Sequence, residues 1–94
     1  MHLFDENIKN LGLNIPDLPK ALANYAPYIN IGKTMYISGQ APVQNGEVIY
    51  QGKVGSDFTI EEGVEAAKLC CTNIIAALKK CVDGDWDKLD SFVK

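Results

Sequence analysis

One stretch of the chain, positions 34–42, combines chemically useful side chains with a change from strand to turn. Side chains alternate across a β-strand, so Tyr36, Ser38 and Gln40 share one face. That face offers an aromatic ring, a hydroxyl and an amide, which suit a polar small molecule or a partner subunit. Gly39 has no Cβ, so a ligand or a neighbouring backbone can approach closely at this point. An ordinary strand followed by a loop is the alternative interpretation, because short motifs often match by chance.

A preceding strand is predicted to bring a second aromatic ring to the same place. Segment 24–31 favours extended structure, and the Gly-Lys pair at 32–33 predicts a tight turn into the stretch described above. In such a hairpin Tyr25, early in the first strand, lies near Ser38 and Gln40, late in the second. Tyr25 is therefore a candidate ligand-binding residue, with a packing aromatic at a strand start as the alternative.

The strongest structural pattern predicts a helix over 59–82. Thr59 and Glu62 have the spacing of a capping box. Asn73, in the middle, is a poor helix former, so we expect its amide to donate to a neighbouring loop or to reach a ligand pocket; a solvent-facing amide is the alternative. Apolar residues recur on one face, which we expect to be buried against a sheet: Ile60, Val64, Ala67, Cys71, Ile74, Ile75, Leu78 and Val82.

The remaining segments complete a small α+β pattern. Apolar spacing predicts a short helix over 4–13, and two prolines make 14–20 an extended connector. An Asn-Gly turn precedes a short predicted strand over 47–51. Trp86 is expected to anchor the end of the long helix. Residues 91–94 have the composition of a strand that is just beginning, so we expect the domain to be incomplete.

Length and charge restrict the class of protein. Ninety-four residues support a single domain, 1–94, with a thin core, for which oligomerisation is a plausible source of added stability. A formal net charge of −3 without a basic cluster argues against a nucleic-acid partner. No apolar run is long enough to span a bilayer, so we expect no membrane partner and a cytoplasmic location.

The three cysteines, Cys70, Cys71 and Cys81, fall within the predicted long helix. We expect buried, reduced thiols, because free cysteine is among the most buried residue types. A zinc site would need more ligands than these, and His2 is the only histidine. A nucleophilic cysteine would need a partner base, and the sequence offers no candidate.

Several short motifs occur along the chain in a fixed order: Asn10–Leu13, Asn24-Tyr25, Ile31–Lys33, Met35–Pro42, Gly52–Gly55, Ala66-Ala67, Asn73-Ile74 and Leu78. In this order and spacing they resemble the motifs of the RidA (YjgF) family, also described as L-PSP endoribonucleases. The resemblance covers essentially the whole chain, corresponding to about two thirds of a usual family domain.

The resemblance implies a chorismate-mutase-like α+β fold, with helices on one face of a mixed sheet. It also implies a homotrimer with ligand clefts between subunits. The best-known members hydrolyse reactive enamines or imines, such as 2-aminoacrylate, to 2-keto acids and ammonia, and no cofactor or metal is implied. In those members a tyrosine matching Tyr25 and a serine matching Ser38 line the pocket, an arginine holds the substrate carboxylate, and a downstream glutamate positions water.

The sequence departs from that pattern at the residues expected to do most of the chemistry. It contains no arginine, and the segment that would carry the arginine and the glutamate is absent. Lysine does not replace arginine in bidentate carboxylate recognition. Two functions therefore stay open: a RidA-like enamine/imine deaminase, or a non-catalytic module that binds a carboxylate metabolite or serves assembly.

Overall fold

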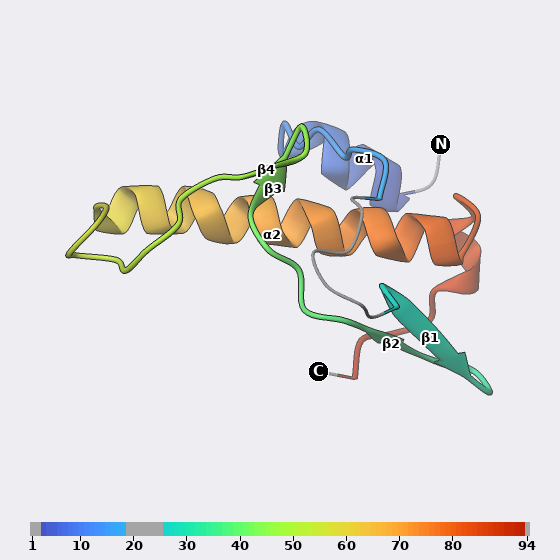
Figure 1. Ribbon diagram of the computed structural model, residues 1–94. Coiled ribbons are helices and arrows are strands. Elements are labelled where there is room, and N and C mark those ends of the chain that lie inside the picture. Colours follow the sequence, from blue (N-terminus) through green and yellow to red (C-terminus); the bar gives the residue numbers. More distant parts are fainter. Residues whose placement is uncertain (1–2, 19–25, 94) are drawn as a thin grey trace.

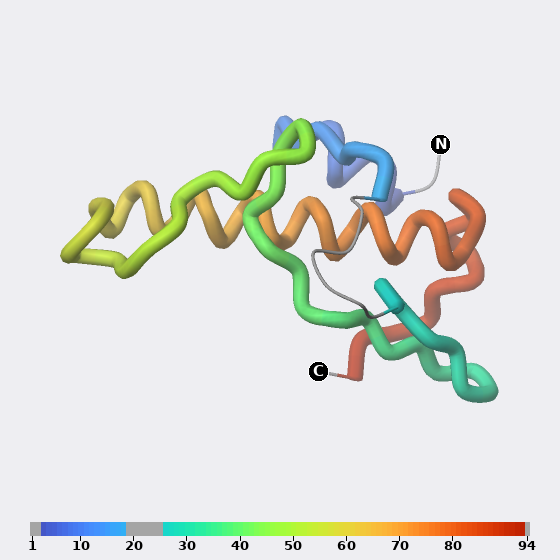
Figure 2. Tube along the Cα trace, in the orientation of Figure 1, coloured from blue at the N-terminus to red at the C-terminus, as the bar shows by residue number. Residues whose placement is uncertain are grey.

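The computed structural model describes residues 3–18 and 26–93, and one long helix organises them (Figure 1). This helix, α2 (Ile60–Cys81), has a short helix, α1 (Leu3–Asn10), on one side of its C-terminal half and a β-hairpin on the other. The N-terminal half of α2 runs beyond both, and among the described residues the loop that leads into it lies alongside (Figure 2). No helix in the described ranges is long and apolar enough to cross a bilayer.

The ends of α2 follow from local sequence. Thr59 Oγ1 accepts a hydrogen bond from the Glu62 backbone N–H at 3.1 Å, and Glu62 Oε1 accepts one from the Thr59 N–H at 2.9 Å. This reciprocal pair confirms the predicted capping box and satisfies two N–H groups at the helix start. At the other end Asp83 takes a left-handed conformation (φ 53°), and the Gly84 N–H donates to the Lys79 carbonyl at 2.9 Å. The helix therefore closes with a Schellman-type ending directly after the predicted last residue.

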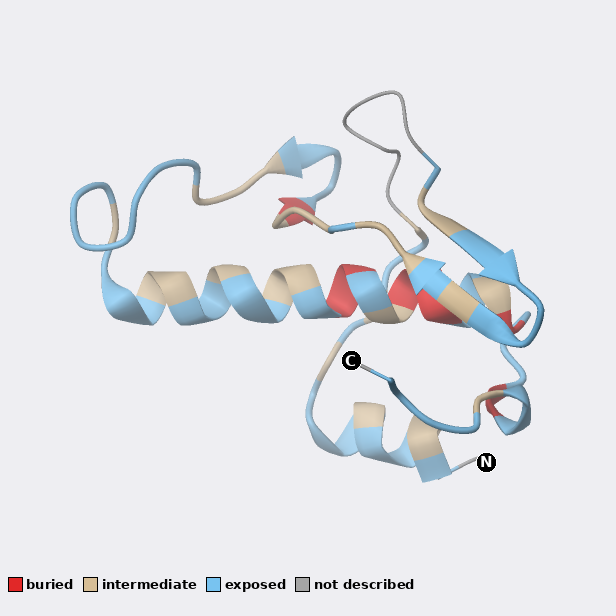
Figure 3. Ribbon diagram, turned by 90° about the horizontal axis from the view of Figure 1, so that it is seen from below, coloured by how far each residue is buried: buried red, intermediate tan, exposed pale blue. Residues whose placement is uncertain are grey.

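The core lies at the C-terminal half of α2. Leu78, Val82 and Trp86 are buried together, and Trp86, in the 3-10 helix η1 (Trp86–Lys88), is 2% exposed. Figure 3 shows the buried residues gathered mainly along this part of the helix. The Trp86 ring stacks on Phe4 of α1, with centroids 4.2 Å apart, so the predicted anchor is confirmed. Partly buried side chains complete the cluster: Phe4, Ile8, Met35, Ile37, Ile75 and Leu89.

The first hairpin joins β1 (Tyr28–Ile31) to β2 (Thr34–Ile37) in antiparallel register, with Tyr28 opposite Ile37 and Ile31 opposite Thr34. Gly32, the first turn residue, has φ 61°, as a two-residue type II′ turn requires. Met35 and Ile37 face the core, whereas Tyr36 is 58% exposed, which confirms the predicted alternation.

The second hairpin is shorter, with β3 (Val43–Gln44) antiparallel to β4 (Glu47–Val48). Asn45 and Gly46 both have positive φ, 52° and 81°, the conformation that an Asn-Gly type I′ turn needs. The strand predicted over 47–51 ends early, because Tyr50 takes a left-handed conformation (φ 60°) that an extended ladder does not tolerate.

The architecture is α+β, as expected, but the described strands form two separate two-stranded antiparallel sheets instead of one mixed sheet. Residues 91–93 are not in a strand, so the strand predicted at 91–94 is wrong for the part that the structure describes. Without a paired neighbour, a segment of strand-like composition has nothing to fix it in a ladder.

The predicted buried face of α2 is only half correct. Leu78 and Val82 are buried and Ile75 is partly buried, but five residues of the same face are exposed. We call these five the α2 stripe: Ile60, Val64, Ala67, Cys71 and Ile74. The cause is the placement of the packing elements, which gather on the C-terminal half of the helix (Figure 1).

The same placement explains the thiols. All three cysteines are free, as predicted, but Cys71 is exposed, and Cys70 and Cys81 are only partly buried. The prediction of buried thiols is therefore wrong for Cys71, since nothing in the described ranges covers its side of α2.

Candidate functional site

The candidate site lies where the chain leaves β2 and crosses to α2 (Figure 1). Ser38, Gly39 and Gln40 follow β2 directly, and the next residues pass along the middle of α2 before entering β3. Tyr25, the other predicted ligand-binding residue of the hairpin, falls outside the described residues.

Ser38 is fixed against the segment that precedes β1. Its Oγ donates a hydrogen bond to the carbonyl oxygen of Ala26, and its backbone N–H donates to the carbonyl of Pro27 at 2.9 Å. Ser38 thus contacts Ala26, the residue next to Tyr25 in sequence, while the predicted position of Tyr25 itself stays a prediction. A hydroxyl that donates to a carbonyl keeps its oxygen lone pairs as acceptors, so Ser38 can still receive a hydrogen bond from a ligand.

Gln40 continues the same local network. Its Nε2 donates to the Ser38 carbonyl at 3.2 Å, which holds the amide close to the serine. Gln40 is partly buried, and its Oε1 accepts no hydrogen bond from the described residues. Ser38 and Gln40 therefore present two oxygen acceptors from one short piece of backbone.

Gly39, between them, is exposed and does not take a left-handed conformation. A Cβ added there would meet no atom of the described residues within 4 Å. Neither backbone strain nor packing within the described chain therefore demands glycine at this position. The open space is available to a ligand or a neighbouring subunit, as the sequence suggested.

Asn73 anchors the segment that follows the site. Its side chain is fully buried, and its Nδ2 donates to the carbonyl oxygens of Ala41 at 3.0 Å and Val43 at 3.1 Å. The amide therefore donates to a neighbouring loop, which was one of the two roles predicted for it. The solvent-facing alternative is wrong. Its Oδ1 is buried and accepts no hydrogen bond from the described residues.

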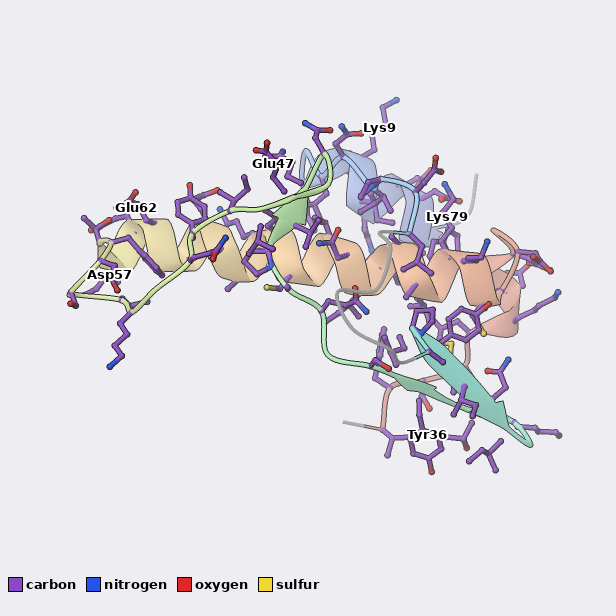
Figure 4. The ribbon with its side chains drawn as sticks, in the orientation of Figure 1. Lys9, Tyr36, Glu47, Asp57, Glu62 and Lys79 are labelled. Atoms are coloured by element: carbon purple, nitrogen blue, oxygen red, sulfur yellow. The ribbon has the colours of Figure 1, made fainter. Side chains whose placement is uncertain are left out.

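Tyr36 lies on the outer surface of the first hairpin and points away from α2 (Figure 4). It is 58% exposed, and Ile29, its cross-strand partner, is 57% exposed. The aromatic ring thus belongs to an exposed apolar surface, while Ser38 and Gln40 are tied to the backbone around them.

One contact near the site escaped sequence reasoning. Cys81 Sγ donates a hydrogen bond to Asn30 Oδ1 at 3.3 Å, which ties the first hairpin to the end of α2. The alternation of side chains could have indicated this contact. Asn30 pairs with Met35, which faces the core, so Asn30 lies on the inner face of β1.

The next features concern metal ligands and the thiol groups of α2. The described part of the chain holds no cluster of three or more histidine, cysteine or acidic side chains that could bind a metal ion. Elsewhere on α2, burial raises the pKa of the Cys70 thiol, with a smaller raising effect from Cys71, although a backbone hydrogen bond acts in the opposite direction.

Comparison with known proteins identifies the family and the fold. A family model described as YjgF/chorismate mutase-like, putative endoribonuclease, matches residues 5–92. Protein TCP17 of Trypanosoma cruzi is 28% identical over 88 residues, which cover 94% of this chain and 54% of the relative.

Two solved structures share the fold. The crystal structure of a putative endoribonuclease from Shewanella oneidensis has 38% sequence identity and a TM-score of 0.77, over 84% of this chain and 52% of its own. The protein Atu1372 from Agrobacterium tumefaciens, of unknown function, has 35% identity and a TM-score of 0.75, over 88% and 50% respectively. The chain thus spans about half the length of the relatives it matches.

Proposed function

Because the chain belongs to the YjgF/chorismate-mutase-like family, we propose that it contributes to an enamine/imine deaminase site of the RidA type at the end of β2. The substrate class is a reactive 2-aminoacrylate-type imine, and the products are a 2-keto acid and ammonia. The observation that supports this proposal is the pair of acceptor groups, Ser38 and Gln40, on either side of the open position at Gly39. We propose a cytoplasmic location for this activity.

The reaction needs few groups from this chain. The enamine 2-aminoacrylate first gains a proton from water at C3 and loses one from nitrogen, which gives the imine 2-iminopropanoate. Water then adds to the C=N carbon to give a carbinolamine, and loss of ammonia from that carbon leaves the keto group. Ser38 Oγ can accept a hydrogen bond from the substrate nitrogen or from the attacking water, because its own proton is directed to the Ala26 carbonyl. Gln40 Oε1 can accept a second one and so orient the water. Tyr25 is proposed as a further pocket residue, from the family pattern alone.

Asn73 serves this site through the backbone. By holding the Ala41 and Val43 carbonyls it fixes the path of the chain directly after Gln40. We therefore propose that Asn73 is a positioning residue for the ligand-binding segment, and that it acts through the loop.

The substrate carboxylate needs a positively charged partner, and the given sequence contains no arginine for this role. The outer surface of the first hairpin is apolar: Ile29 is 57%, Ile31 63% and Tyr36 58% exposed. Such a surface suits a subunit contact. We propose that this surface forms a homotrimer, with the site in a cleft between subunits.

A second candidate function rests on the donor capacity that Gln40 retains. Its Nε2 donates one hydrogen to the Ser38 carbonyl and carries a second one, which could bind a keto acid without turnover of an imine. In that case the chain is a binding or assembly module of the same family.

The two functions are separated by one assay with matched variants. Ammonia and pyruvate release from freshly generated 2-aminoacrylate is compared for the wild type, Ser38→Ala, and Ser91→Ala as an exposed serine outside the site. Turnover above the uncatalysed rate that is lost only in Ser38→Ala supports the deaminase. Without turnover, saturable pyruvate-dependent shifts of the Gly39 amide resonance support the binding module. Neither turnover nor binding, or cleavage of an RNA oligonucleotide, would overturn both.

A further inference from the structure

The turn between β3 and β4 carries a pair of residues whose chemistry the site at the end of β2 does not use. Asn45 and Gly46 are both exposed, and both have positive φ, 52° and 81°. The side-chain amide of an asparagine is an electrophile close to the next backbone nitrogen, because attack of that nitrogen on Cγ closes a five-membered ring. A side chain on the following residue hinders the attack, and glycine has none.

Asn45 is the asparagine of this chain with the least hindered neighbour. The sequence contains seven asparagines, and a bulky residue follows each of the other six. Isoleucine, which follows four of them, is branched at Cβ and crowds its own backbone nitrogen most strongly. The six hindered pairs are Asn7-Ile8, Asn10-Leu11, Asn14-Ile15, Asn24-Tyr25, Asn30-Ile31 and Asn73-Ile74.

The attacking nitrogen is also free of other contacts. The Gly46 N–H donates no hydrogen bond to any group in the described ranges, so nothing there holds its proton. The aspartate–glycine pair at the end of α2 differs in this respect. There the Gly84 N–H, which follows Asp83, donates to the Lys79 carbonyl at 2.9 Å. Ring closure is therefore favoured at Asn45 both by sequence and by hydrogen bonding.

The folded turn controls how often the ring can close. In the left-handed conformation of a type I′ turn, the Cβ of Asn45 lies nearly opposite the Gly46 nitrogen about the Cα–C bond. Ring closure needs the two atoms on the same side, so the turn must open first. Opening costs little free energy, because β3 and β4 pair over two positions only and a hairpin this short is marginally stable.

We infer that Asn45 is a site of spontaneous covalent modification. The Gly46 nitrogen forms a bond to Asn45 Cγ, the side-chain amino group leaves with that nitrogen's proton as ammonia, and a succinimide remains. Water then adds to one of the two imide carbonyl carbons, and the C–N bond at that carbon breaks. The product is aspartate or isoaspartate at position 45, with water as the co-reactant. This inference does not depend on the proposed deaminase function.

The modification changes the hairpin in two ways. Either product adds a negative charge two positions from Glu47, and isoaspartate also lengthens the backbone by one methylene group. A two-residue turn with an extra backbone atom no longer places Gln44 opposite Glu47, so the hairpin should open. Val43 begins this hairpin, and its carbonyl accepts a hydrogen bond from Asn73. The modification therefore loosens the backbone that follows the candidate site.

Ageing of the full chain in mildly alkaline buffer, followed by peptide mass spectrometry, tests this inference. The exchange of ammonia for water should be about tenfold faster at Asn45 than at Asn30, an exposed asparagine of the other hairpin that isoleucine follows. Isoaspartate should be among the products, because direct hydrolysis of the side-chain amide gives aspartate alone. Equal rates at the two positions, or aspartate without isoaspartate, would overturn the inference.

Two variants separate the ring chemistry from the protection by the turn. Gly46→Ala should slow the reaction about tenfold in urea, where the strain that alanine puts on the folded turn plays no part. Asn73→Ala releases the Val43 carbonyl, so it should speed the reaction several-fold in the folded chain and leave the rate in urea unchanged.

The wild-type chain is the reference for both variants, and it should react about tenfold faster in urea than when folded. A Gly46→Ala chain that reacts as fast as the wild type in urea would refute ring closure. Equal wild-type rates in the folded chain and in urea would refute the control by the turn.

Discussion

The side-chain amide of Asn73 donates a hydrogen bond to the carbonyl oxygen of Ala41 at 3.0 Å, across 32 positions of sequence. A second bond from the same nitrogen reaches the Val43 carbonyl. These contacts join the middle of the long helix to the backbone that follows Ser38–Gln40. The position of the candidate site thus depends on one fully buried polar side chain.

Replacement of this side chain tests that dependence. Asn73→Ala should lower the free energy of unfolding by about 3 kcal/mol, because one buried and one partly buried hydrogen bond are lost and the space is not refilled. Urea denaturation measures the change. Asn7→Ala, an exposed asparagine on α1, is the matched control and should change stability by less than about 0.5 kcal/mol. Equal effects of the two variants would show that the anchor is not important for stability.

Gly39 offers a test of ligand binding that does not depend on stability. Because an added Cβ meets nothing within 4 Å in the described chain, Gly39→Ala should leave the free energy of unfolding unchanged or raise it by about 0.5 kcal/mol. If the ligand uses this space, the same variant should weaken pyruvate binding about tenfold, as a one-methyl clash in a tight site does. An NMR titration measures the binding.

Gly32→Ala is the contrasting control for that experiment. Gly32 has φ 61° in the β1–β2 turn, so alanine should cost about 1 kcal/mol there. Should Gly39→Ala destabilise the protein as much as Gly32→Ala, the structure around Gly39 would have to be tighter than described.

The features that sequence predicted correctly are those decided by neighbouring residues. The Thr59–Glu62 capping box, the turn at Gly32 and the turn at Asn45-Gly46 each depend on contacts or dihedral angles within a few positions. Short-range rules are reliable here because little else competes with them.

The features that sequence missed are decided by distant parts of the chain. Periodicity alone identified an apolar face on α2, but it could not show that α1 and the first hairpin cover Leu78 and leave Val64 open. The role of Asn73 was also ambiguous, because its partners lie about 30 positions away. Tyr50 ended a strand through a left-handed conformation for which its residue type gives no signal.

The adjacent thiols on α2 should differ in reactivity. Cys71 is exposed, whereas burial raises the pKa of Cys70. Near pH 8 the fraction of Cys70 in the reactive thiolate form is therefore smaller than that of a free cysteine. Iodoacetamide should therefore modify Cys71 several-fold faster than Cys70, and the rate for Cys70 should rise at higher pH than for a free thiol. Single-cysteine variants followed by mass spectrometry give both rates at low protein concentration. Faster modification of Cys70 would contradict the described burial.

The last prediction concerns the bond between Trp86 and Asp5. The Trp86 Nε1 donates to Asp5 Oδ1 at 2.8 Å, which links η1 to the first turn of α1. A hydrogen bond to a charged acceptor in a partly buried place contributes about 1.5–3 kcal/mol. A double-mutant cycle of Trp86→Phe and Asp5→Ala should therefore show a coupling energy of at least about 1 kcal/mol in urea denaturation.

The control for this cycle is Glu6→Ala, which removes a neighbouring exposed acid from the same helix turn. Both Asp5 and Glu6 interact favourably with the dipole of α1, so that contribution appears in each single variant and cancels in the cycle. Glu6→Ala should show no coupling to Trp86→Phe, since Glu6 lacks the indole contact. If both acids couple to Trp86 equally, the effect would come from helix electrostatics, and the hydrogen bond would not be what docks α1 onto the core.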